Sequence, residues 1–371
     1  MSFERKKIAL VHDWLNGMRG GEKCLEVFCE IFPKADLYTL FHEPGKVSST
    51  IESMRIIPSF VQRLPFVFKK YRHYLPLFPT AIEQFNLSNY DLILSSSHCV
   101  AKGIRHNGKP YHVSYIHTPM RYMWGLFDTY FGKGRTSWGL RTAAKTMRPY
   151  LQNWDFHSSD RVHHFICNSY NVQQRILKIY NRKSEVIHPP VDLSRFHAGT
   201  GKKNYYLMIG AFAPNKRVDL AIEAFNILKI PLKIVGSGQD EAYCKRIAQA
   251  HIEFLGNVDD ERIAQLYQEA KAFVFPGEDD FGITPLEAQA CGTPVIAFGK
   301  GGALETVTEE TGIFFHEPTV TALQNAVEQM ETGKHQISSE ACVDHARKFG
   351  RDRYKQQILN SLEAGYQQHF S

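Results

Sequence analysis

Residues 272–298 of the chain read AFVFPGEDDFGITPLEAQACGTPVIAF. A short apolar run ends at Pro276, and a second apolar run begins after Pro294. Between them, an acidic stretch containing glycine leads into a segment with helical character, and Pro285 is well placed for the first turn of that helix. Strand, loop, helix and strand in this order predict a βαβ unit, in which the strands are parallel and helices cover the sheet.

The same alternation extends in both directions along the chain. Short apolar runs predict further strands at 8–11, 37–41, 92–95, 112–117, 165–169, 186–187, 205–211, 232–235, 252–255 and 312–315, and amphipathic stretches predict helices at 218–228, 241–250 and 260–270. With 371 residues, the chain exceeds the roughly 250 to 300 at which a single core stops growing. We therefore predict an α/β fold of two doubly wound, Rossmann-like domains that join at Pro189-Pro190.

The two halves differ in charge. Residues 1–190 contain 26 Lys and Arg against 14 Asp and Glu, a net charge of +12, and the remainder carries −6. All four tryptophans also fall in the basic half, a pattern typical of an interface or a binding groove. A membrane surface, an anionic lipid or a nucleic acid would each fit, although surface charge often serves only solvation. No basic aromatic module such as an RNA-recognition pattern is present, which disfavours a nucleic-acid partner.

Ligands of doubly wound sheets bind beyond the carboxyl ends of the strands, so candidate chemistry is sought there. After the first strand, Gly20-Gly21 precedes a predicted helix, where backbone N–H groups can approach a phosphate. The spacing matches neither a dinucleotide fingerprint nor a P-loop. His117 ends another strand and could contact a sugar hydroxyl or a developing charge. Taken alone, the glycines could form a plain turn and the histidine could be structural.

The acidic stretch after Pro276 is the third such place. Asp279 and Glu287 lie eight positions apart, on either side of Phe281-Gly282 and Ile283, where a loop meets the start of a helix. Exposed backbone N–H groups at that point could meet a phosphate or a sugar.

These residues carry a family resemblance. The stretch 279–295 resembles the E-x7-E region of the retaining glycosyltransferases of family 4, which are two-domain GT-B enzymes. Other segments match in order over nearly the whole chain: Gly20-Gly21, His117, Asn168-Ser169, 189–192, Lys216 to Asp219, 235–238 and 254–258. The runs 18–23 and 117–122 further resemble the bacterial branch that builds O-antigen and other surface polysaccharides, often from GDP-mannose.

The resemblance implies a domain arrangement and a reaction. It implies domains at 1–190 and 191–345 that face each other across a cleft, with residues 346–371 forming a helix that crosses back to the N-terminal domain. It also implies a metal-independent, retaining hexosyltransferase without a bound cofactor, whose nucleotide-sugar donor is a substrate. The acceptor would be a lipid-diphosphate-linked glycan.

The resemblance also implies the roles of individual residues. Lys216 and Arg217 would stabilise the diphosphate together with the N–H groups of Gly20 and Gly21. Glu287 would bind the ribose and Val258 the base, and Asp279 would bind the hexose with the backbone of Phe281, Gly282 and Ile283. His117 would contact the same hexose. Asp279, Lys216 and His117 are thus the candidate catalytic residues.

Two positions depart from the family pattern. Asp279 stands where the family usually has Glu, and Ala211 stands where it usually has an Arg five residues before the lysine. Arg217 could compensate for the missing arginine. No D-x-D triplet occurs, so we expect no bound metal.

Alternatives remain open at this point. A UDP- or dTDP-sugar could replace GDP-mannose. A phosphorylase-like or epimerase-like enzyme of the same fold is possible, as is a non-catalytic protein that binds a nucleotide sugar or a lipid.

Two segments of the basic half interleave aromatic and basic residues, residues 59–75 and residues 135–148. Such elements are typical of an amphipathic surface that binds an anionic membrane, although the apolar members could instead belong to the core. Neither a signal peptide nor a membrane span is evident in the sequence. We expect a cytoplasmic protein that is peripheral on the inner face of the cell membrane.

Overall fold

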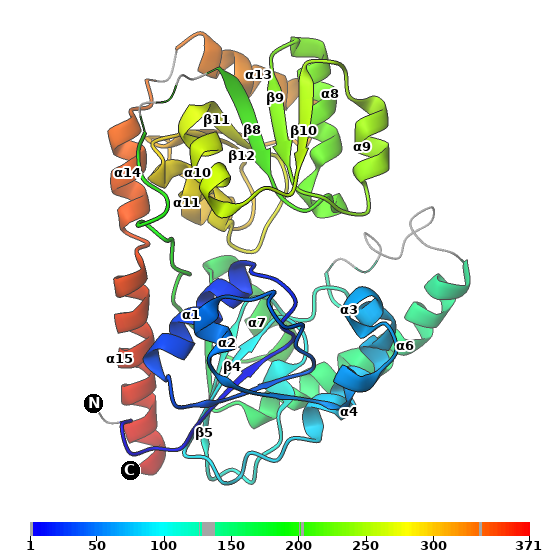
Figure 1. Cartoon of the computed structure of the whole chain (residues 1–371), viewed down its shortest axis with the longest axis vertical. Coiled ribbons are helices and arrows are strands. Elements are labelled where there is room, and N and C mark those ends of the chain that lie inside the picture. Colours follow the sequence, from blue (N-terminus) through cyan, green and yellow to red (C-terminus); the bar gives the residue numbers. More distant parts are fainter. Residues whose placement is uncertain (1–2, 126, 128–137, 200, 202–203, 334–335) are drawn as a thin grey trace. The chain divides into compact units, whose positions relative to one another are not determined.

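The computed structural model describes residues 3–125, 127, 138–199, 201, 204–333 and 336–371. The chain divides into two compact units: unit 1 comprises Met1–Pro189 with Tyr354–Ser371, and unit 2 comprises Pro190–Arg353. Each unit is built on one sheet of parallel strands with helices packed on both faces (Figure 1). The predicted α/β class and the doubly wound design of both halves are confirmed.

In unit 1, the strands follow the order β3-β2-β1-β4-β5-β6-β7. They are β1 (Ile8–His12), β2 (Asp36–Thr39), β3 (Arg55–Pro58), β4 (Leu92–Ser97), β5 (Tyr111–Ile116), β6 (His164–Cys167) and β7 (Glu185–Val186). The helices are α1 (Gly20–Ile31), α2 (Ser49–Glu52), η1 (Phe60–Arg63), α3 (Val67–Lys70), η2 (Tyr71–Leu77), α4 (Phe78–Glu83), η3 (Ala101–Gly103), α6 (Trp138–Ser158), η4 (Ser159–Arg161) and α7 (Tyr170–Tyr180). The long final helix α15 (Arg351–Phe370) contributes most of its length to this unit.

In unit 2, the strands follow the order β10-β9-β8-β11-β12-β13. They are β8 (Tyr205–Ile209), β9 (Leu232–Val235), β10 (Ile252–Gly256), β11 (Ala270–Phe275), β12 (Val295–Phe298) and β13 (Gly312–Phe315). The helices are η5 (Pro214–Lys216), α8 (Val218–Leu228), α9 (Glu241–Ile247), α10 (Asp260–Glu269), α11 (Ile283–Ala290), α12 (Ala303–Thr306), α13 (Val320–Glu331) and α14 (Ser339–Arg347).

Alternation along the strands explains the two-sided cores. In β8, Tyr205 and Leu207 pack with α10 and α11, whereas Tyr206 and Met208 pack on the other face with α8 and α13. Ile8 and Leu10 of β1 likewise lie in a different cluster from Ala9 and Val11. Because successive side chains of a strand point to opposite faces, a strand covered on both sides must be apolar throughout. This is why the apolar runs predicted the strands well.

Two features differ from the sequence predictions. The edge strand β3 was not predicted, because its four residues are exposed or half-buried and form no buried apolar run. The tryptophans do not gather in an open groove: Trp14 is buried, and the indole N–H groups of the half-buried Trp124 and Trp154 donate to Asp155 and Glu83. The side chain of Trp138 lies outside the described part of the chain.

A cluster of histidines packs where β5 and β6 begin. The ring of His163 lies 5.5 Å from that of His106 and 4.4 Å from that of His369 on α15. The backbone N–H of His112 donates to Nδ1 of His163 over 2.9 Å, so this nitrogen must be unprotonated. Burial lowers the pKa of His163 to about 4, and the neighbouring His369 and His106 add to the effect.

Unit 1 should therefore lose stability as the pH falls from about 6.5 towards 4. The pKa of His163 is lower in the folded state, so the unfolded chain binds a proton first, and its contribution to stability is complete only above its ordinary pKa. The midpoint of urea unfolding, followed by the fluorescence of the tryptophans, which all belong to residues 1–190, checks this at pH 7.5 and pH 5. His163→Gln should flatten the dependence of the urea midpoint on pH. His157→Gln, at an exposed position of α6, should leave that dependence unchanged. If the urea midpoint changes with pH equally in both variants, this account is wrong.

Candidate functional site

The switch point of unit 2 lies between β8 and β11, where the strand order reverses direction. Lys216 lies on the segment that leaves β8, and Asp279 lies on the segment that leaves β11. Their side chains form an ion pair, with Lys216 24% exposed and Asp279 13% exposed. The Lys216 ammonium group also lies 5.8 Å from the centre of the Phe275 ring. The structure thus joins two of the candidate catalytic residues at the place where such sheets bind ligands.

Glycines hold these two segments together. A Cβ at Gly277 would collide with the carbonyl oxygen of Asn215 and come 2.7 Å from the Cα of Lys216. The backbone after β11 can therefore pass directly against the turn that carries Lys216. On the other side, the N–H of Gly302 donates to the carbonyl oxygen of Asp279 over 2.9 Å. Contacts on both sides thus fix the backbone of Asp279.

The start of α11 follows at once. Phe281 is buried, with its ring 6.1 Å from that of Phe349. Gly282 has a φ of +84° and immediately precedes the helix, and Ile283 is its first residue. A positive φ at this point favours glycine, since a Cβ there would come 3.2 Å from the Phe275 ring. The first N–H groups of α11 have no partners within their own helix and are available to an anion or a hydroxyl.

Glu287 lies one turn further along α11 and is 5% exposed. It accepts a hydrogen bond of 3.3 Å from the hydroxyl group of Tyr267 on α10. Burial, with the nearby Glu287 carboxylate, raises the pKa of Tyr267 well above its usual range, so Tyr267 remains a donor. This contact fixes one oxygen of a carboxylate in a mostly apolar setting.

The remaining candidates of unit 2 border the same edge of the sheet. Val258 follows β10 and is half-buried. Arg217 caps the start of α8 with a φ of +52°, and its Nε lies 3.2 Å from Oδ1 of Asp219. Ala211 is exposed just after β8. Arg217, which the sequence suggested as a substitute for an arginine at 211, is thus paired with Asp219 on its own helix.

Unit 1 gathers a second group of polar side chains at its switch point between β1 and β4. His117 follows β5, and its Nε2 lies 2.9 Å from the hydroxyl group of Ser96 at the end of β4. The same hydroxyl group lies 3.0 Å from Nδ1 of His12 at the end of β1. Nε2 of His12 lies 3.9 Å from the buried carboxylate of Glu22. We call Glu22, His12, Ser96 and His117 the histidine relay.

The glycines after β1 are not a loop, as the sequence suggested, because Gly20 and Gly21 are the first two residues of α1. A Cβ at Gly21 would lie 3.5 Å from the His12 ring and 3.6 Å from the His117 ring, so the helix start packs directly on the relay. Nothing lies within 4 Å of a Cβ at Gly20. The start of α1 thus lies directly against His117 within unit 1.

Asp13 anchors the other side of this group. Its two carboxylate oxygens accept from four consecutive backbone N–H groups, those of residues 98–101, over 2.6 to 2.9 Å. Nδ1 of His98 also lies 3.1 Å from Oδ2 of this carboxylate. Because β1 and β4 are neighbours, this contact fixes the two strand ends that carry the relay.

Burial sets the charge state of the relay. It lowers the pKa of His117 well below the usual range, and the neighbouring His98 and His12 add to the shift. Burial alone would raise the pKa of Glu22, but the contact with His12 outweighs it and holds that pKa below its ordinary value. His117 is therefore a neutral imidazole, and Glu22 is an anion.

The sequence analysis missed Glu22, His12, Asp13, Ser96 and Tyr267. His12 and Asp13 stand at the end of the first predicted strand, and Glu22 lies in the run 18–23, so an acid or histidine at a strand end was the available signal. Ser96 is separated from His12 by 84 residues, so only the pairing of β1 with β4 reveals the contact.

Removing the Ser96 hydroxyl should disturb His117 without unfolding the unit. We expect Ser96→Ala to lower kcat of the reaction proposed below by about 2- to 10-fold, the worth of one hydrogen bond, and to shift the pH profile of kcat. Ser95→Ala is a matched control, because Ser95 bonds His112 at 2.9 Å and takes no part in the relay. Steady-state kinetics over a pH series decide the matter. Equal kcat and pH profiles in the two variants would exclude a positioning role for Ser96.

Among the described residues, no group of three or more His, Cys, Asp or Glu side chains could hold a metal ion. Within the same residues, no helix is long and apolar enough to cross a membrane.

Comparisons with known proteins bear on the family of the chain. A family model described as Glycosyltransferase Family 4 matches residues 28–195, and one described as Glycosyl transferases group 1 matches residues 192–349. A D-inositol 3-phosphate glycosyltransferase of Mycobacteroides abscessus is 28% identical over 54% of this chain and 52% of its own length. The O-antigen chain mannosyltransferase RfbU of Salmonella typhimurium is 28% identical over 55% of this chain and 61% of its own length. The chain thus spans about half the length of the curated relatives that it matches.

Solved structures extend the likeness to the whole fold. HepE of Anabaena in complex with UDP and glucose superposes with a TM-score of 0.74 at 18% identity, over 97% of this chain and all of that one. Sucrose-phosphate synthase from Thermosynechococcus elongatus gives a TM-score of 0.73 at 18% identity, over 97% and 99% of the two chains. With one parallel sheet in each unit and consecutive matches over residues 28–349, the chain belongs to the family 4 and group 1 glycosyltransferases of the GT-B fold.

Proposed function

We propose that the protein is a retaining glycosyltransferase that takes a hexose from a nucleotide sugar bound in unit 2. The ion pair of Lys216 with Asp279 at the switch point carries this proposal. A cation there can stabilise the diphosphate, and an acid beside it can accept hydrogen bonds from sugar hydroxyls. The N–H groups at the start of α11, from Gly282 and Ile283 onward, add donors to the same edge of the sheet.

The reaction requires charge stabilisation more than proton transfer. The bond from the anomeric carbon to the diphosphate breaks, and the acceptor oxygen bonds to the same face of that carbon, which retains its configuration. The acceptor proton passes to the leaving phosphate. Negative charge grows on that phosphate, where Lys216 offers a preorganised cation in place of a metal.

The other residues would hold the donor. Glu287, with one oxygen fixed by Tyr267, would accept hydrogen bonds from the ribose hydroxyls. Val258 would offer its backbone to the base. Asp279 would hold the hexose with the backbone of Phe281 and Gly282. Unit 1 would contribute neutral His117 and the N–H groups of Gly20 and Gly21 to the same reaction.

We further propose GDP-mannose as the donor, which the similarity to the mannosyltransferase RfbU supports. The likeness to HepE with UDP favours a UDP-sugar as the second candidate. Thermal-shift screening of GDP-, UDP- and dTDP-sugars distinguishes them, because a ligand at 100 times its Kd stabilises the fold by about 2.7 kcal/mol. Release of the nucleoside diphosphate from the bound sugar, with EDTA present, would support a metal-independent enzyme. Tight binding without any release would favour a non-catalytic nucleotide-sugar-binding protein, and strict dependence on Mg²⁺ or Mn²⁺ would overturn metal independence.

For the acceptor, we propose a lipid-diphosphate-linked glycan on the inner face of the cell membrane. The exposed apolar side chains of the segment η1-α3-η2 support a membrane contact: Phe66 is 72% exposed, and Phe60, Phe68 and Leu77 are also exposed. Exposed Arg63, Lys69, Lys70, Arg72 and His73 alternate with them. Val61 and Val67 are buried and fix the segment to the unit. In the second predicted membrane element, Arg148 donates to the carbonyl oxygen of Met123, which occupies part of its guanidinium group, and Arg135 lies outside the described residues.

Charge reversal at this segment should release the protein from anionic vesicles. Each basic residue near an anionic surface is worth about 1 kcal/mol, so replacing Lys69, Lys70 and Arg72 by Glu should lower binding by about 100-fold or more. Flotation on phosphatidylglycerol vesicles measures this. The matched control replaces Lys34, Lys46 and Lys109, which are exposed elsewhere on unit 1, by Glu. Equal losses in both triple variants would mean that net charge alone, and no defined surface, determines binding.

A further inference from the structure

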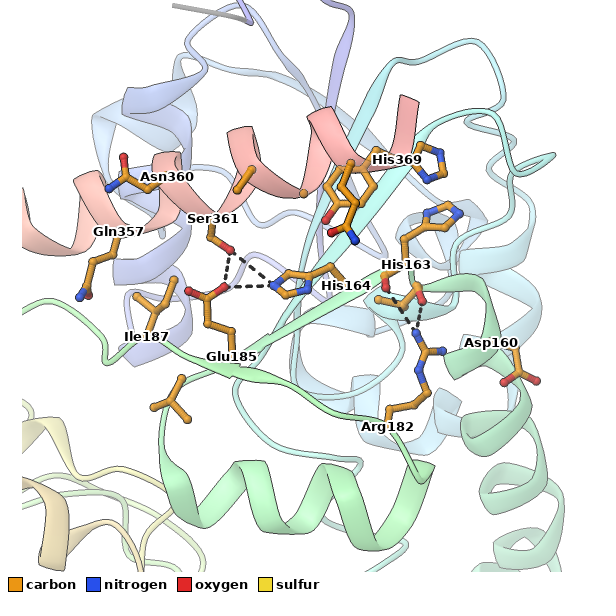
Figure 2. A pocket seen from close by; sticks show the side chains of 16 residues that line it. Asp160, His163, His164, Arg182, Glu185, Ile187, Gln357, Asn360, Ser361 and His369 are labelled. Carbon is orange, nitrogen blue, oxygen red and sulfur yellow. Dashed lines mark hydrogen bonds and ion pairs between the residues drawn. The ribbon is translucent and has the colours of Figure 1, made fainter. Parts of the chain in front are cut away.

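Unit 1 contains a pocket of about 880 Å³ that the reaction proposed above does not use. Its floor is made by the beginnings of β5 and β6 and by β7, and its roof is one side of α15 (Figure 2). Tyr111 and His164 begin β5 and β6, with His163 just before β6, whereas His12 is the last residue of β1 and His117 follows the carboxyl end of β5. In a parallel sheet these ends lie on opposite edges, so the pocket is separate from the histidine relay. Its volume lies within the range of small-ligand sites.

One face of α15 is specialised towards this pocket. The residues of α15 that line it are Gln357, Asn360, Ser361, Ala364, Gly365, Gln368 and His369. Their spacing of three and four places them along a single side of the helix. Three of them are carboxamides, which both donate and accept hydrogen bonds. Ala364 is small and exposed, and Gly365 lets the Tyr111 ring pack against the helix, because a Cβ there would collide with the Tyr111 hydroxyl group.

The opposite wall carries a fixed carboxylate. Glu185 accepts from the Ser361 hydroxyl group over 2.5 Å, and the same oxygen lies 3.1 Å from Nε2 of His164. Figure 2 shows these three side chains pointing towards one another, with Gln357 and Asn360 to one side and His163 and His369 to the other. The contact with His164 lowers the pKa of Glu185, so it is an anionic acceptor at neutral pH.

The charges of the lining disfavour an anionic ligand. Its permanently charged side chains are Asp160, Glu185 and Arg182. The Arg182 guanidinium group donates to the carbonyl oxygens of Val162 and Ser159 over 2.7 and 3.1 Å and lies over the Phe165 ring. An anion would therefore meet two carboxylates and a cation already committed to backbone carbonyls. The polar lining disfavours a lipid chain, and no metal-binding group occurs among the described residues.

We propose that this pocket binds a neutral, hydroxyl-rich ligand, namely a segment of oligosaccharide. Sugar hydroxyls donate and accept at once, as do the carboxamides of α15, and Glu185 supplies a charged acceptor. The half-buried apolar side chain of Val186 suits the C–H face of a sugar ring. This goes beyond the proposed donor site and does not depend on it. The pocket would hold a glycan away from the place of transfer.

Saturation-transfer NMR with maltotriose and α-1,6-mannotriose tests the proposal on the full chain. Wild type should bind at least one of them, and Ala364→Trp, which fills the pocket from an exposed helix position, should weaken that binding at least 10-fold. Gln367→Trp is the matched control, since Gln367 is exposed on α15 outside the lining, and it should bind within 2-fold of wild type. Asn360→Ala should weaken binding by about 2- to 10-fold.

Two further arms separate this proposal from others. Lys216→Ala should bind the trisaccharides as wild type does. Binding of the trisaccharides is thus measured independently of the donor site, and an error in the assignment of Lys216 would not affect it. Inorganic phosphate should not compete. Competition by phosphate, equal binding in Ala364→Trp, or no binding of either trisaccharide at millimolar concentration would each overturn the proposal.

Discussion

Replacing Lys216 by alanine should lower kcat/KM for sugar transfer by about 100- to 1,000-fold, the cost of removing one preorganised donor from a developing negative charge. The ammonium group is partly buried and held by Asp279, so it is in place before the diphosphate arrives and needs little reorganisation. Most of the loss should fall on kcat, because the charge grows in the transition state. Steady-state kinetics with the donor found by thermal shift measure it.

The matched control is Lys300→Ala. Lys300 also pairs with an acid of the same loop, lying 3.1 Å from Glu278, but it is 61% exposed. Screened surface pairs contribute little, so this variant should retain wild-type kinetics. Similar losses in both variants would show that general loop electrostatics, and not the Lys216 ammonium group, drive catalysis.

Replacing Asp155 by alanine should destabilise unit 1 by about 3 to 5 kcal/mol, because it leaves a buried ammonium group without its partner. Lys102 and Asp155 are 1% and 0% exposed and lie 2.8 Å apart. The carboxylate also accepts from the indole of Trp124 and the hydroxyl group of Tyr180, over 2.7 and 2.9 Å. One residue of α6 thus ties together η3, α7 and the segment after β5.

Urea unfolding followed by tryptophan fluorescence measures this loss. Arg55→Ala is the control, since Arg55 pairs with Asp36 at 3.3 Å but is 77% exposed, and the change should stay within about 1 kcal/mol. If Asp155→Ala unfolds at the wild-type urea concentration, the buried pair does not stabilise the unit.

The strands could be predicted because burial on both faces leaves a local signal. Leu232 to Val235 and Gly312 to Phe315 were predicted with their observed bounds. β3 lacked that signal, since an edge strand needs no apolar run. Gly20-Gly21 was interpreted as a turn before a helix, whereas the two glycines are the first residues of α1, and the missing side chain of Gly21 lets the helix begin against His12 and His117.

The candidate residues could be found singly, but most of their contacts could not. Lys216 and Asp279 each follow a strand, which the sequence shows, but their ion pair spans 63 residues and depends on β8 lying beside β11. Ser96 and Tyr267 become relevant only through the residues that they touch. Nearness in sequence can also mislead. Arg217 stands beside Lys216, which suggested a shared role, but the structure pairs Arg217 with Asp219.

Titration calorimetry with GDP and UDP tests most directly whether the nucleotide binds at the carboxyl end of the unit 2 sheet. Wild type should bind at least one of them, and Glu287→Gln, which keeps the side-chain volume but removes the anionic acceptor, should weaken that binding about 10-fold or more. Glu278→Gln, in the same loop but paired with Lys300, should bind as wild type. Binding of neither nucleotide by wild type, or equal affinity in wild type and Glu287→Gln, would contradict the account.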